Sequence, residues 1–478
     1  MFKRIFISLC VLIILLGLVS PAIADNPLPD VLAWGYNAEG QTNVPADFAN
    51  DNAIAAGYYH NLALKVDGTV WTWGGNDSGQ LGNGGSDLGA HPDPAPVGGL
   101  DKVTAIAAGA YHSLVIRDDG KVWVWGRNAQ GQLGDGSTSD SFLPKQVAGL
   151  GPNGNGFTRA IAGGYGHSLA ALTDGSVWAW GLNNMGQLGL SIGGASLGAS
   201  SVQNIADAPS PRFVLDPPPA LSLPSDFKVG SYPGMVLGPN AGGTVPYYNP
   251  TPIQVPVVNN VVAVAAGYDH SVALINDGTV WTWGDNSIGQ LGLGTADGDP
   301  HPVPALVPRL FNVVAIAAGV GHSLALKSDG TVWAWGRNVD GELGDGTTTD
   351  ASRPVQVTVL SGPVRAIAAG GYHSLAVFRD GTLAAWGLDT QGQIDLPQNV
   401  NNGSRVSAGL MHSLTVLANR PPWDINGDHV VNVLDITRLG AHFGETGPAG
   451  WIPEDVNSDG GINVLDVSAI GLNWGRTW

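Results

Sequence analysis

A phrase of about 50 residues recurs seven times along the chain, and this repeat constrains the fold more than any other feature. Each copy resembles A-A-G-x-x-H-S-L-A-L, then Asp-Gly, then T-V-W-x-W-G-x-N-x-x-G-Q-L-G. The repeated histidines are His60, His112, His167, His270, His322, His373 and His412, and the Trp-Gly pairs begin at Trp34, Trp73, Trp125, Trp180, Trp283, Trp335 and Trp386. A unit that recurs in this way buries its apolar surface against its neighbours, so a repeat architecture is expected.

The local pattern in each copy is that of β-strands. His-Ser-Leu-Ala-Leu and Thr-Val-Trp-x-Trp alternate with a period of two and are rich in β-branched and aromatic residues. Asp-Gly separates the two runs in six copies, as in Asp67-Gly68 and Asp380-Gly381, and this predicts hairpins with type I′ turns. Each copy can therefore supply a small antiparallel sheet, which is the blade of a β-propeller.

The two ends of the repeat region complement each other. The last copy has its histidine strand, His412 to Val416, but no Trp-Gly pair follows it. The first segment, Val31 to Gly35, has the Trp-Gly pair but no histidine strand before it. We therefore predict an all-β, seven-bladed propeller over residues 25–419, in which the N-terminal strand closes the ring and removes open sheet edges.

These repeats resemble the regulator of chromosome condensation repeat family over about residues 31 to 417. The resemblance implies a seven-bladed propeller but does not fix a function, because the fold is a scaffold. The nuclear member that names the family exchanges nucleotide on a small GTPase and sits on chromatin. Similar propellers also occur as secreted bacterial proteins, including an inhibitor that caps a β-lactamase. These are the closer precedent, because the N-terminal residues 1–24 of this chain resemble an export signal.

The N-terminus is typical of a secretory signal. Lys3 and Arg4 precede an apolar run from Ile5 to Val19, and Ala22-Ile23-Ala24 offers a cleavage site. Residues 1–24 are therefore predicted to be a signal peptide, with an uncleaved membrane anchor as the alternative. The mature protein would therefore be secreted or associated with the cell surface. The chain's one cysteine, Cys10, lies in the removed segment, so the mature protein would contain no disulfide.

The formal charge of −18 argues against nucleic-acid or anionic-membrane binding, because both need a cationic surface. We expect no membrane insertion after signal cleavage, and a monomer. An inserted loop is predicted at residues 191–250, since His167 and His270 are separated by about two repeat lengths and the excess is rich in Pro, Gly, Ala and Ser. It is either a place for ligand contacts or a solvated loop.

A second, duplicated module is predicted after the linker Arg420-Pro421-Pro422, over residues 420–478. Two loops place oxygen side chains at positions 1, 3, 5, 9 and 12, with a backbone carbonyl at position 7, which is calcium-ligand spacing. Both loops are followed by an apolar helical stripe, so a small α-helical domain holding about two calcium ions is expected. The ligands are Asp424, Asn426, Asp428, Val430, Asn432, Asp435, Asp455, Asn457, Asp459, Gly461, Asn463 and Asp466.

This module resembles a dockerin, which implies docking onto a cohesin-type partner. His429 stands where glycine is expected at position 6 of the first loop, and this departure would weaken the first site. Val433-Leu434 and Val464-Leu465 stand where dockerins often carry small hydroxyl residues, so the cohesin specificity departs from the common pattern.

No catalytic motif is convincing. The histidines recur at one position of every repeat, which is typical of buried structural residues, and the Trp-x-Trp residues are expected to pack the blades. The G-x-S-x-G run at residues 194–198 lies in the insertion without the flanking strand and helix that this motif needs. We predict a secreted, non-enzymatic adaptor that binds an extracellular protein; the alternatives are an inhibitor of an extracellular enzyme and a hydrolase with a site in the central channel.

Overall fold

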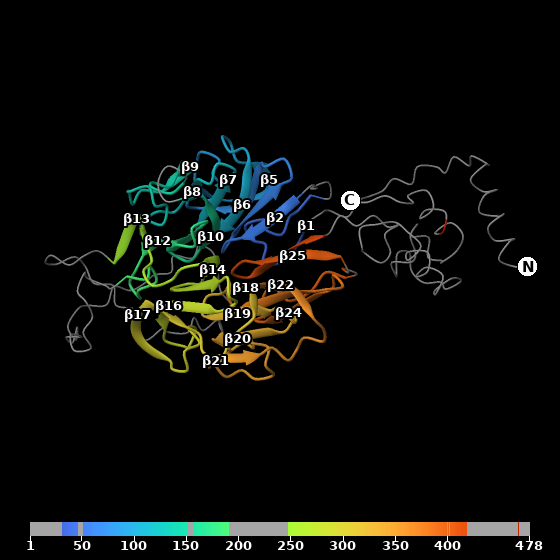
Figure 1. The fold of residues 1–478 in the computed structure, drawn as a ribbon. Helices are drawn as coiled ribbons and strands as arrows, with labels where there is room; N and C mark the ends of the chain where they lie inside the picture. Colours follow the sequence, from blue (N-terminus) through green and yellow to red (C-terminus); the bar gives the residue numbers. More distant parts are fainter. Residues whose placement is uncertain are drawn as a thin grey trace, which may run out of the picture.

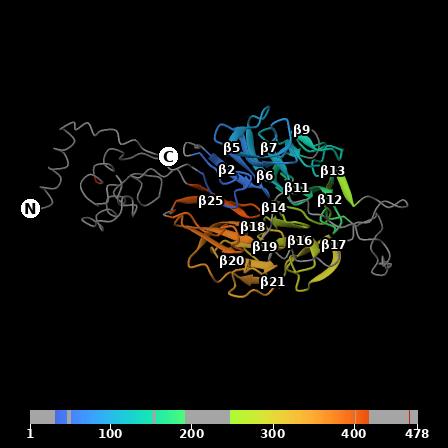
Figure 2. The ribbon, with the colours of Figure 1, turned by 180° about the vertical axis from the view of Figure 1, so that it is seen from behind.

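The computed structural model describes residues 31–45, 51–151, 156–190, 247–398, 400, 402–417 and 467. Within these residues the chain forms seven antiparallel sheets of three or four strands each. The strands of six sheets follow one another in sequence, and the seventh combines the first strand of the chain with the last two. The sheets stand in chain order around a common centre, and Figure 2 shows the same ring from behind (Figure 1). The predicted seven-bladed β-propeller is therefore confirmed.

The blades are numbered from the first complete sheet. Blades 1 to 3 contain β2 (Asp51–Ala56), β3 (His60–Lys65), β4 (Val70–Asn76) and β5 (Asp87–Pro96); β6 (Val103–Ala108), β7 (His112–Arg117), β8 (Val122–Gly126) and β9 (Ser141–Gln146); and β10 (Thr158–Gly163), β11 (His167–Leu172), β12 (Val177–Leu182) and β13 (Tyr248–Gln254). Blades 4 and 5 contain β14 (Val261–Ala266), β15 (His270–Ile275), β16 (Val280–Asn286) and β17 (Asp297–Leu306); and β18 (Val313–Ala318), β19 (His322–Lys327), β20 (Val332–Gly336) and β21 (Ala351–Gln356). Blades 6 and 7 contain β22 (Val364–Ala369), β23 (His373–Phe378) and β24 (Leu383–Gly387); and β25 (Gly403–Ala408), β26 (His412–Leu417) and β1 (Val31–Gly35).

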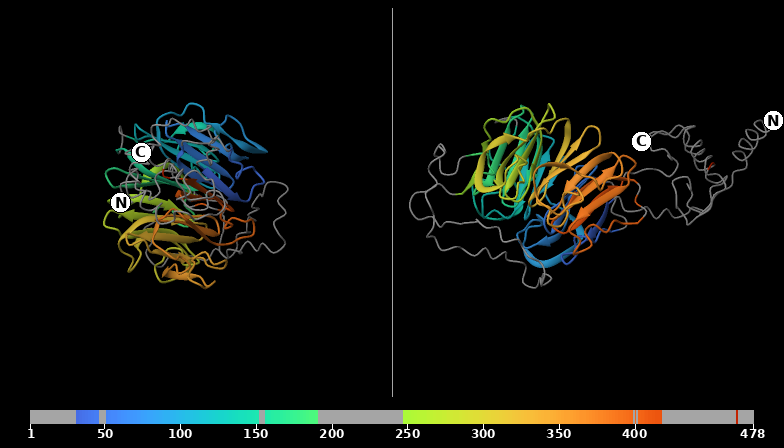
Figure 3. Two further views of the ribbon diagram at one scale, coloured as in Figure 1. Left: turned by 90° about the vertical axis from the view of Figure 1, so that its right-hand side faces the viewer. Right: turned by 90° about the horizontal axis from the view of Figure 1, so that it is seen from below.

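The ring closes through strands from the two ends of the propeller. β1 pairs antiparallel with β26, from Val31 opposite Val416 to Gly35 opposite His412. In the two views of Figure 3 the blue strands of blade 1 lie beside the orange strands of blade 7. This pairing confirms the predicted closure and leaves the ring without a gap in its sequence of sheets.

The Asp-Gly hairpins exist, but their predicted turn type is wrong. In blade 1, Gly68 N donates to Lys65 O at 3.0 Å and Lys65 N donates to Thr69 O at 2.9 Å. Gly68, with φ of 82°, is therefore the last residue of a three-residue loop, a type I turn followed by a left-handed glycine. The Asp67 carboxylate accepts bonds from Thr69 N and Oγ, which holds the dipeptide one position later than a type I′ turn would.

The hydrophobic core lies between neighbouring blades. One cluster joins Leu169, Val177 and Leu188 of blade 3 to Val261 and Trp283 of blade 4. The repeated tryptophans at the Trp-Gly pairs are all buried, and five of them are fully inaccessible: Trp73, Trp125, Trp180, Trp283 and Trp335. The prediction that these tryptophans pack the blades is confirmed.

The predicted insertion is slightly too long. β13 begins at Tyr248, so the last three residues of the 191–250 range belong to blade 3. This outer strand was missed because its sequence, rich in proline and polar residues, lacks the alternation of the other strands.

Several predictions fall outside the described residues. They are the insertion over residues 191–246, the signal segment 1–24, the G-x-S-x-G run and all twelve calcium ligands. Within the described residues, no helix has the length and apolar character needed to cross a bilayer.

Candidate functional site

The seven repeated histidines form a closed ring of hydrogen bonds that joins every blade to the next. Each side chain is fully buried. Six imidazole Nε2 atoms bond the Oγ of a serine in the following blade, and the seventh bonds an asparagine across the closure. The pairs are His60–Ser113 (3.0 Å), His112–Ser168 (2.9 Å), His167–Ser271 (3.1 Å), His270–Ser323 (3.0 Å), His322–Ser374 (3.0 Å), His373–Ser413 (2.9 Å) and His412–Asn61 (2.7 Å).

The serine partners fix the direction of these bonds. Ser113 Oγ donates its proton to the Gln80 carbonyl at 2.8 Å, and the Trp125 indole donates to the same carbonyl at 2.8 Å. Ser113 can then only accept from His60, so the histidine carries its proton on Nε2. Burial lowers the pKa of His60 to about 3, which keeps the imidazole neutral. The histidines are structural, as predicted.

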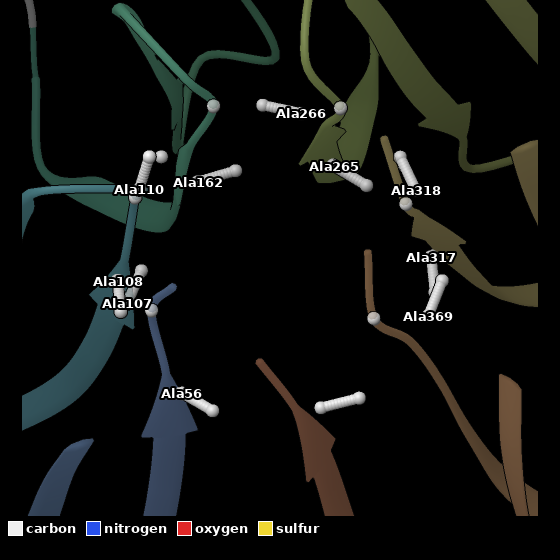
Figure 4. Close-up of a pocket in the computed structure, with 18 of the residues that line it drawn as sticks. Ala56, Ala107, Ala108, Ala110, Ala162, Ala265, Ala266, Ala317, Ala318 and Ala369 are labelled. Carbon is white, nitrogen blue, oxygen red and sulfur yellow. The ribbon is translucent and has the colours of Figure 1, made fainter. Parts of the chain in front are cut away.

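The central channel is lined by small residues from the innermost strand of each blade. Figure 4 shows alanines of several blades, such as Ala56, Ala108 and Ala318, standing around an open centre. The channel has a volume of about 270 Å³, and the described residues that line it include no carboxylate or imidazole. A hydrolase site in this channel would therefore have no carboxylate or imidazole among the described lining residues to act as its general acid or base.

Seven tyrosines gather on one face of the ring, which we call the tyrosine face. They precede a repeated histidine by one or two residues, except for Tyr36, which follows a Trp-Gly pair: Tyr36, Tyr58, Tyr59, Tyr111, Tyr165, Tyr268 and Tyr372. Tyr165 stacks on Tyr268 with ring centroids 4.2 Å apart, and Tyr58 meets Tyr111 edge-on at 5.7 Å. Most of these rings are partly exposed, so the face offers a continuous aromatic surface at the channel mouth.

Ionisable side chains lie beside the tyrosines of this face. The Arg337 guanidinium lies 4.7 Å from the centre of the Tyr372 ring and bonds Asp340 at 2.7 Å as well as Glu342. Burial, and then the nearby Asp285, raise the pKa of Asp269 to about 8, so this carboxyl is protonated at neutral pH. The face therefore combines aromatic rings with a fixed arginine and carboxyl groups.

The insertion begins and ends on the same face. Its described flanks, Leu190 and Tyr247, follow β12 and precede β13, and Asn183 N donates to Tyr247 O at 2.6 Å. Leu182 N donates to Gly166 O, which lies directly after Tyr165. The connections between the third and fourth strands of the blades therefore share this side of the ring with the tyrosines.

The sequence did not predict the tyrosine face. Six of its seven tyrosines occupy the two variable positions of G-x-x-H, where the repeat itself gives no signal. The sequence nevertheless contained a signal: blade 1 carries tyrosine at both of these positions, and blades 2, 3, 4 and 6 carry it at one of them. The contacts between the tyrosine side chains depend on how far apart the blades stand around the propeller axis. The repeat pattern in the sequence carries no information on that distance.

Comparison with known protein families identifies the same repeats that form the blades of the propeller. The regulator of chromosome condensation (RCC1) repeat is matched at residues 67–116, 119–171, 174–219, 277–326 and 329–377, and by a second description of the same repeat at 52–80, 103–132, 159–187, 261–290, 313–342 and 364–393. The chain belongs to the RCC1 repeat family. Residues 422–471 match the dockerin type I domain. Both resemblances inferred from the sequence are thereby confirmed.

Among relatives of this RCC1-repeat chain, the ultraviolet-B receptor UVR8 of Arabidopsis thaliana is 31% identical over 360 residues, which cover 73% of this chain and 79% of the receptor. The E3 ubiquitin-protein ligase HERC2 of Homo sapiens is 30% identical over 331 residues, covering 69% of this chain but 6% of the ligase. The X-linked retinitis pigmentosa GTPase regulator homolog of Caenorhabditis elegans is 31% identical over 327 residues, or 65% of this chain and 22% of that protein. The chain thus spans only a small part of these two longer relatives.

Two solved structures support the RCC1-type fold. Prp20p of Saccharomyces cerevisiae, a protein with binding properties to Gsp1p and histones, aligns with a TM-score of 0.61 at 23% identity, covering 81% of this chain and 91% of that chain. Human WBSCR16 aligns with a TM-score of 0.60 at 21% identity, covering 81% of this chain and all of that chain (100%). At these identities the likeness concerns the fold alone.

An RCC1-type propeller joined to a dockerin domain fits a binding or adaptor role. Dockerin type I domains bind calcium and generally bind cohesins, and they typically occur in secreted or cell-surface proteins. The predicted ligand set, made of aspartate and asparagine side-chain oxygens with one backbone carbonyl per loop, has the chemistry that calcium prefers.

Proposed function

We propose that this protein is a secreted, non-catalytic adaptor. Its propeller binds an extracellular protein through the tyrosine face, and its dockerin tail attaches to a cohesin-type partner or the cell surface. The observation that carries the proposal is the union, in one chain, of a partly exposed aromatic face on a closed ring with a dockerin type I domain. Tyrosine is enriched at protein interfaces because its ring buries apolar area while its hydroxyl bonds polar groups.

The tail would bind about two calcium ions. Asp424, Asn426, Asp428, Val430, Asn432 and Asp435 would hold the first ion, and Asp455, Asn457, Asp459, Gly461, Asn463 and Asp466 the second. Clustered carboxylates repel one another without the metal, so calcium would be needed for the tail to fold and dock.

The remaining parts of the proposal concern organisation. Residues 1–24 would be removed as a signal peptide, residues 25–419 would form a monomeric propeller and residues 420–478 the tail. The acidic charge of −18 supports a partner other than nucleic acid. The described flanks of the insertion lie on the same side of the ring as the tyrosines, which supports one binding face rather than several.

A capture experiment with the full chain tests both halves. The immobilised protein is exposed to extracellular proteins of its source, with calcium or with a chelator. We expect one set of captured proteins to depend on calcium and to be lost in Asp424→Ala/Asp455→Ala. A second set should survive chelation and be lost in Tyr165→Ala/Tyr268→Ala. If chelation and the tail variant change nothing, the attachment role fails; if the tyrosine variant changes nothing, the binding face fails.

A further inference from the structure

Two tyrosines of the tyrosine face carry an arginine over the ring. The Arg127 guanidinium lies 5.6 Å from the centre of the Tyr111 ring, and the Arg337 guanidinium lies 4.7 Å from that of Tyr372. Both arginines occupy the position directly after a Trp-Gly pair. Arg127 belongs to the same blade as its tyrosine, whereas Arg337 reaches from the preceding blade. A tyrosine directly before a repeated histidine can therefore receive a cation from either of two positions.

At Tyr59, neither position carries a cation. The position in the same blade is Gly75, whose N–H donates to Tyr59 O at 2.8 Å. The position in the preceding blade is Tyr36, whose ring lies 5.9 Å from that of Tyr59 at an angle of 60°. A Cβ added at Gly75 would lie 3.3 Å from Tyr59 Cβ and 3.6 Å from Glu39 Cγ. Because Gly75 has no side chain, blade 1 places no group of its own at this position between Tyr59 and Glu39.

The carboxylates that would receive a cation are nevertheless present. Glu39 lies three residues after Tyr36, as Asp340 lies three residues after Arg337, and Asp340 is the carboxylate that Arg337 bonds. Burial first, and then the neighbouring Asp77, raise the pKa of Glu39, while His91 lowers it. The negative charge at this place is therefore incompletely balanced within the described residues.

Buried polar atoms point to the same place. Tyr36 is only 9% exposed, yet its hydroxyl has no hydrogen-bond partner within the described residues, and the same holds for Nε2 of the fully buried Gln41. In blade 4 the corresponding atoms satisfy each other, because Gln290 Nε2 donates to Asp285 Oδ2 at 2.6 Å. Buried polar groups are rarely left unmatched, so these two atoms of blade 7 remain available to bond a further polar group. Gln393 Nε2, at the same position of blade 6, also has no partner within the described residues, but no unmatched hydroxyl accompanies it there.

We propose that Tyr36, Glu39, Tyr59 and Asp77, which we call the seam site, bind an arginine side chain of the partner protein, in the role that Arg337 plays within the chain. A planar guanidinium can lie on the Tyr59 ring and donate to Glu39 and Asp77 together. A divalent metal fits less well, because within the described residues no three or more histidine and acidic side chains are arranged to hold one. This inference rests on the proposed function and specifies the chemistry of its partner.

The test uses the full-length protein and a blocked pentapeptide, Gly-Gly-Arg-Gly-Gly, compared by calorimetry at low salt with the same peptide carrying citrulline. Citrulline has the shape of arginine without its charge. We expect the arginine peptide to bind at least about tenfold more tightly, the amount that one cation–π contact with one ion pair supplies. Glu39→Gln/Asp77→Asn should remove about tenfold of this affinity.

Two controls separate a specific site from diffuse attraction. Asp67→Asn/Asp118→Asn makes the same change in net charge on the opposite face and should alter the affinity less than about twofold. Gly75→Arg places an arginine where blade 2 carries Arg127 and should abolish peptide binding, with unchanged thermal unfolding showing that the ring is intact.

Equal binding of the two peptides, no saturable binding of the arginine peptide, or equal losses in the two double variants would overturn the seam site. None of these results touches the proposed function, because capture by the tail and by Tyr165 and Tyr268 is measured separately. Loss of capture with intact peptide binding would instead refute the proposed function alone.

Discussion

Acidification should unfold the propeller sharply, because of its seven buried histidines. Burial lowers the pKa of six of them to about 3 and that of His270 to about 4. In the unfolded chain each would titrate near 6.5. A group with a depressed folded pKa contributes its full stability above the unfolded pKa and loses it as pH falls toward the folded pKa. The sensitive window therefore lies between pH 6.5 and about 3.

The expected loss follows from these values. Between pH 7 and pH 5 each histidine costs about 2 kcal/mol of unfolding free energy, or about 13 kcal/mol for all seven. Asp269 acts in the opposite direction, since its pKa is raised to about 8 in the fold, and returns about 3 kcal/mol over the same range. The net loss of about 10 kcal/mol is comparable to the whole stability of a typical domain.

The assay is the unfolding free energy from urea titrations, followed by tryptophan fluorescence, at pH values from 7 to 5. Its slope against pH gives the protons taken up on unfolding, and we expect about five near pH 5.5. His322→Asn should lower this number by about one; His91→Asn, at a partly exposed histidine of β5, is the matched control. Uptake of fewer than about two protons, or an unchanged free energy at pH 5, would refute the reasoning.

Three further predictions concern single features. Gly57→Ala should destabilise the propeller by about 1–3 kcal/mol in urea unfolding, because the added Cβ would lie 2.2 Å from His60 Cε1. The control Gly85→Ala should be neutral, because its Cβ would meet nothing within 4 Å, and equal effects of the two variants would contradict the packing argument. Asn61→Ala should cost about 1–3 kcal/mol by leaving His412 unpaired at the closure, and Asn61→Ser, the residue used at the other six junctions, should cost less; the same thermal midpoint for both variants would speak against the hydrogen-bond ring. Full-length protein should bind about two calcium ions by calorimetry and Asp455→Ala/Asp466→Ala about one, so an unchanged stoichiometry would exclude the second loop as a site.

The architecture was predictable because the repeat carries both strand alternation and the incomplete first and last copies. The register of Val31 to Gly35 against His412 to Val416 follows directly from which half of the repeat each end contains. The turn type was not predictable from Asp67-Gly68, since the dipeptide fits loops of two or three residues and the choice depends on where Gly68 adopts its positive φ.

The candidate face was less accessible to sequence reasoning. The stacking of Tyr165 on Tyr268 joins residues about 100 positions apart, with the insertion between them, and only the closed ring brings blades 3 and 4 together. The seam site is harder still to predict, since Tyr36 comes from the first strand segment and reaches Tyr59 only because β1 completes the last blade. The calcium loops are a different case, because their proposed ligands are local in sequence and the prediction rests on their spacing alone.

The closure also decides how a tethered propeller would face its surroundings. β26 runs from His412, at the tyrosine face, to Leu417 at the opposite side, and β1 enters from that opposite side at Val31. The described chain therefore enters and leaves the propeller behind its aromatic surface. Because the described part of the last blade ends at Leu417 on the side opposite the tyrosines, the proposed attachment and the proposed capture start from different surfaces of the ring.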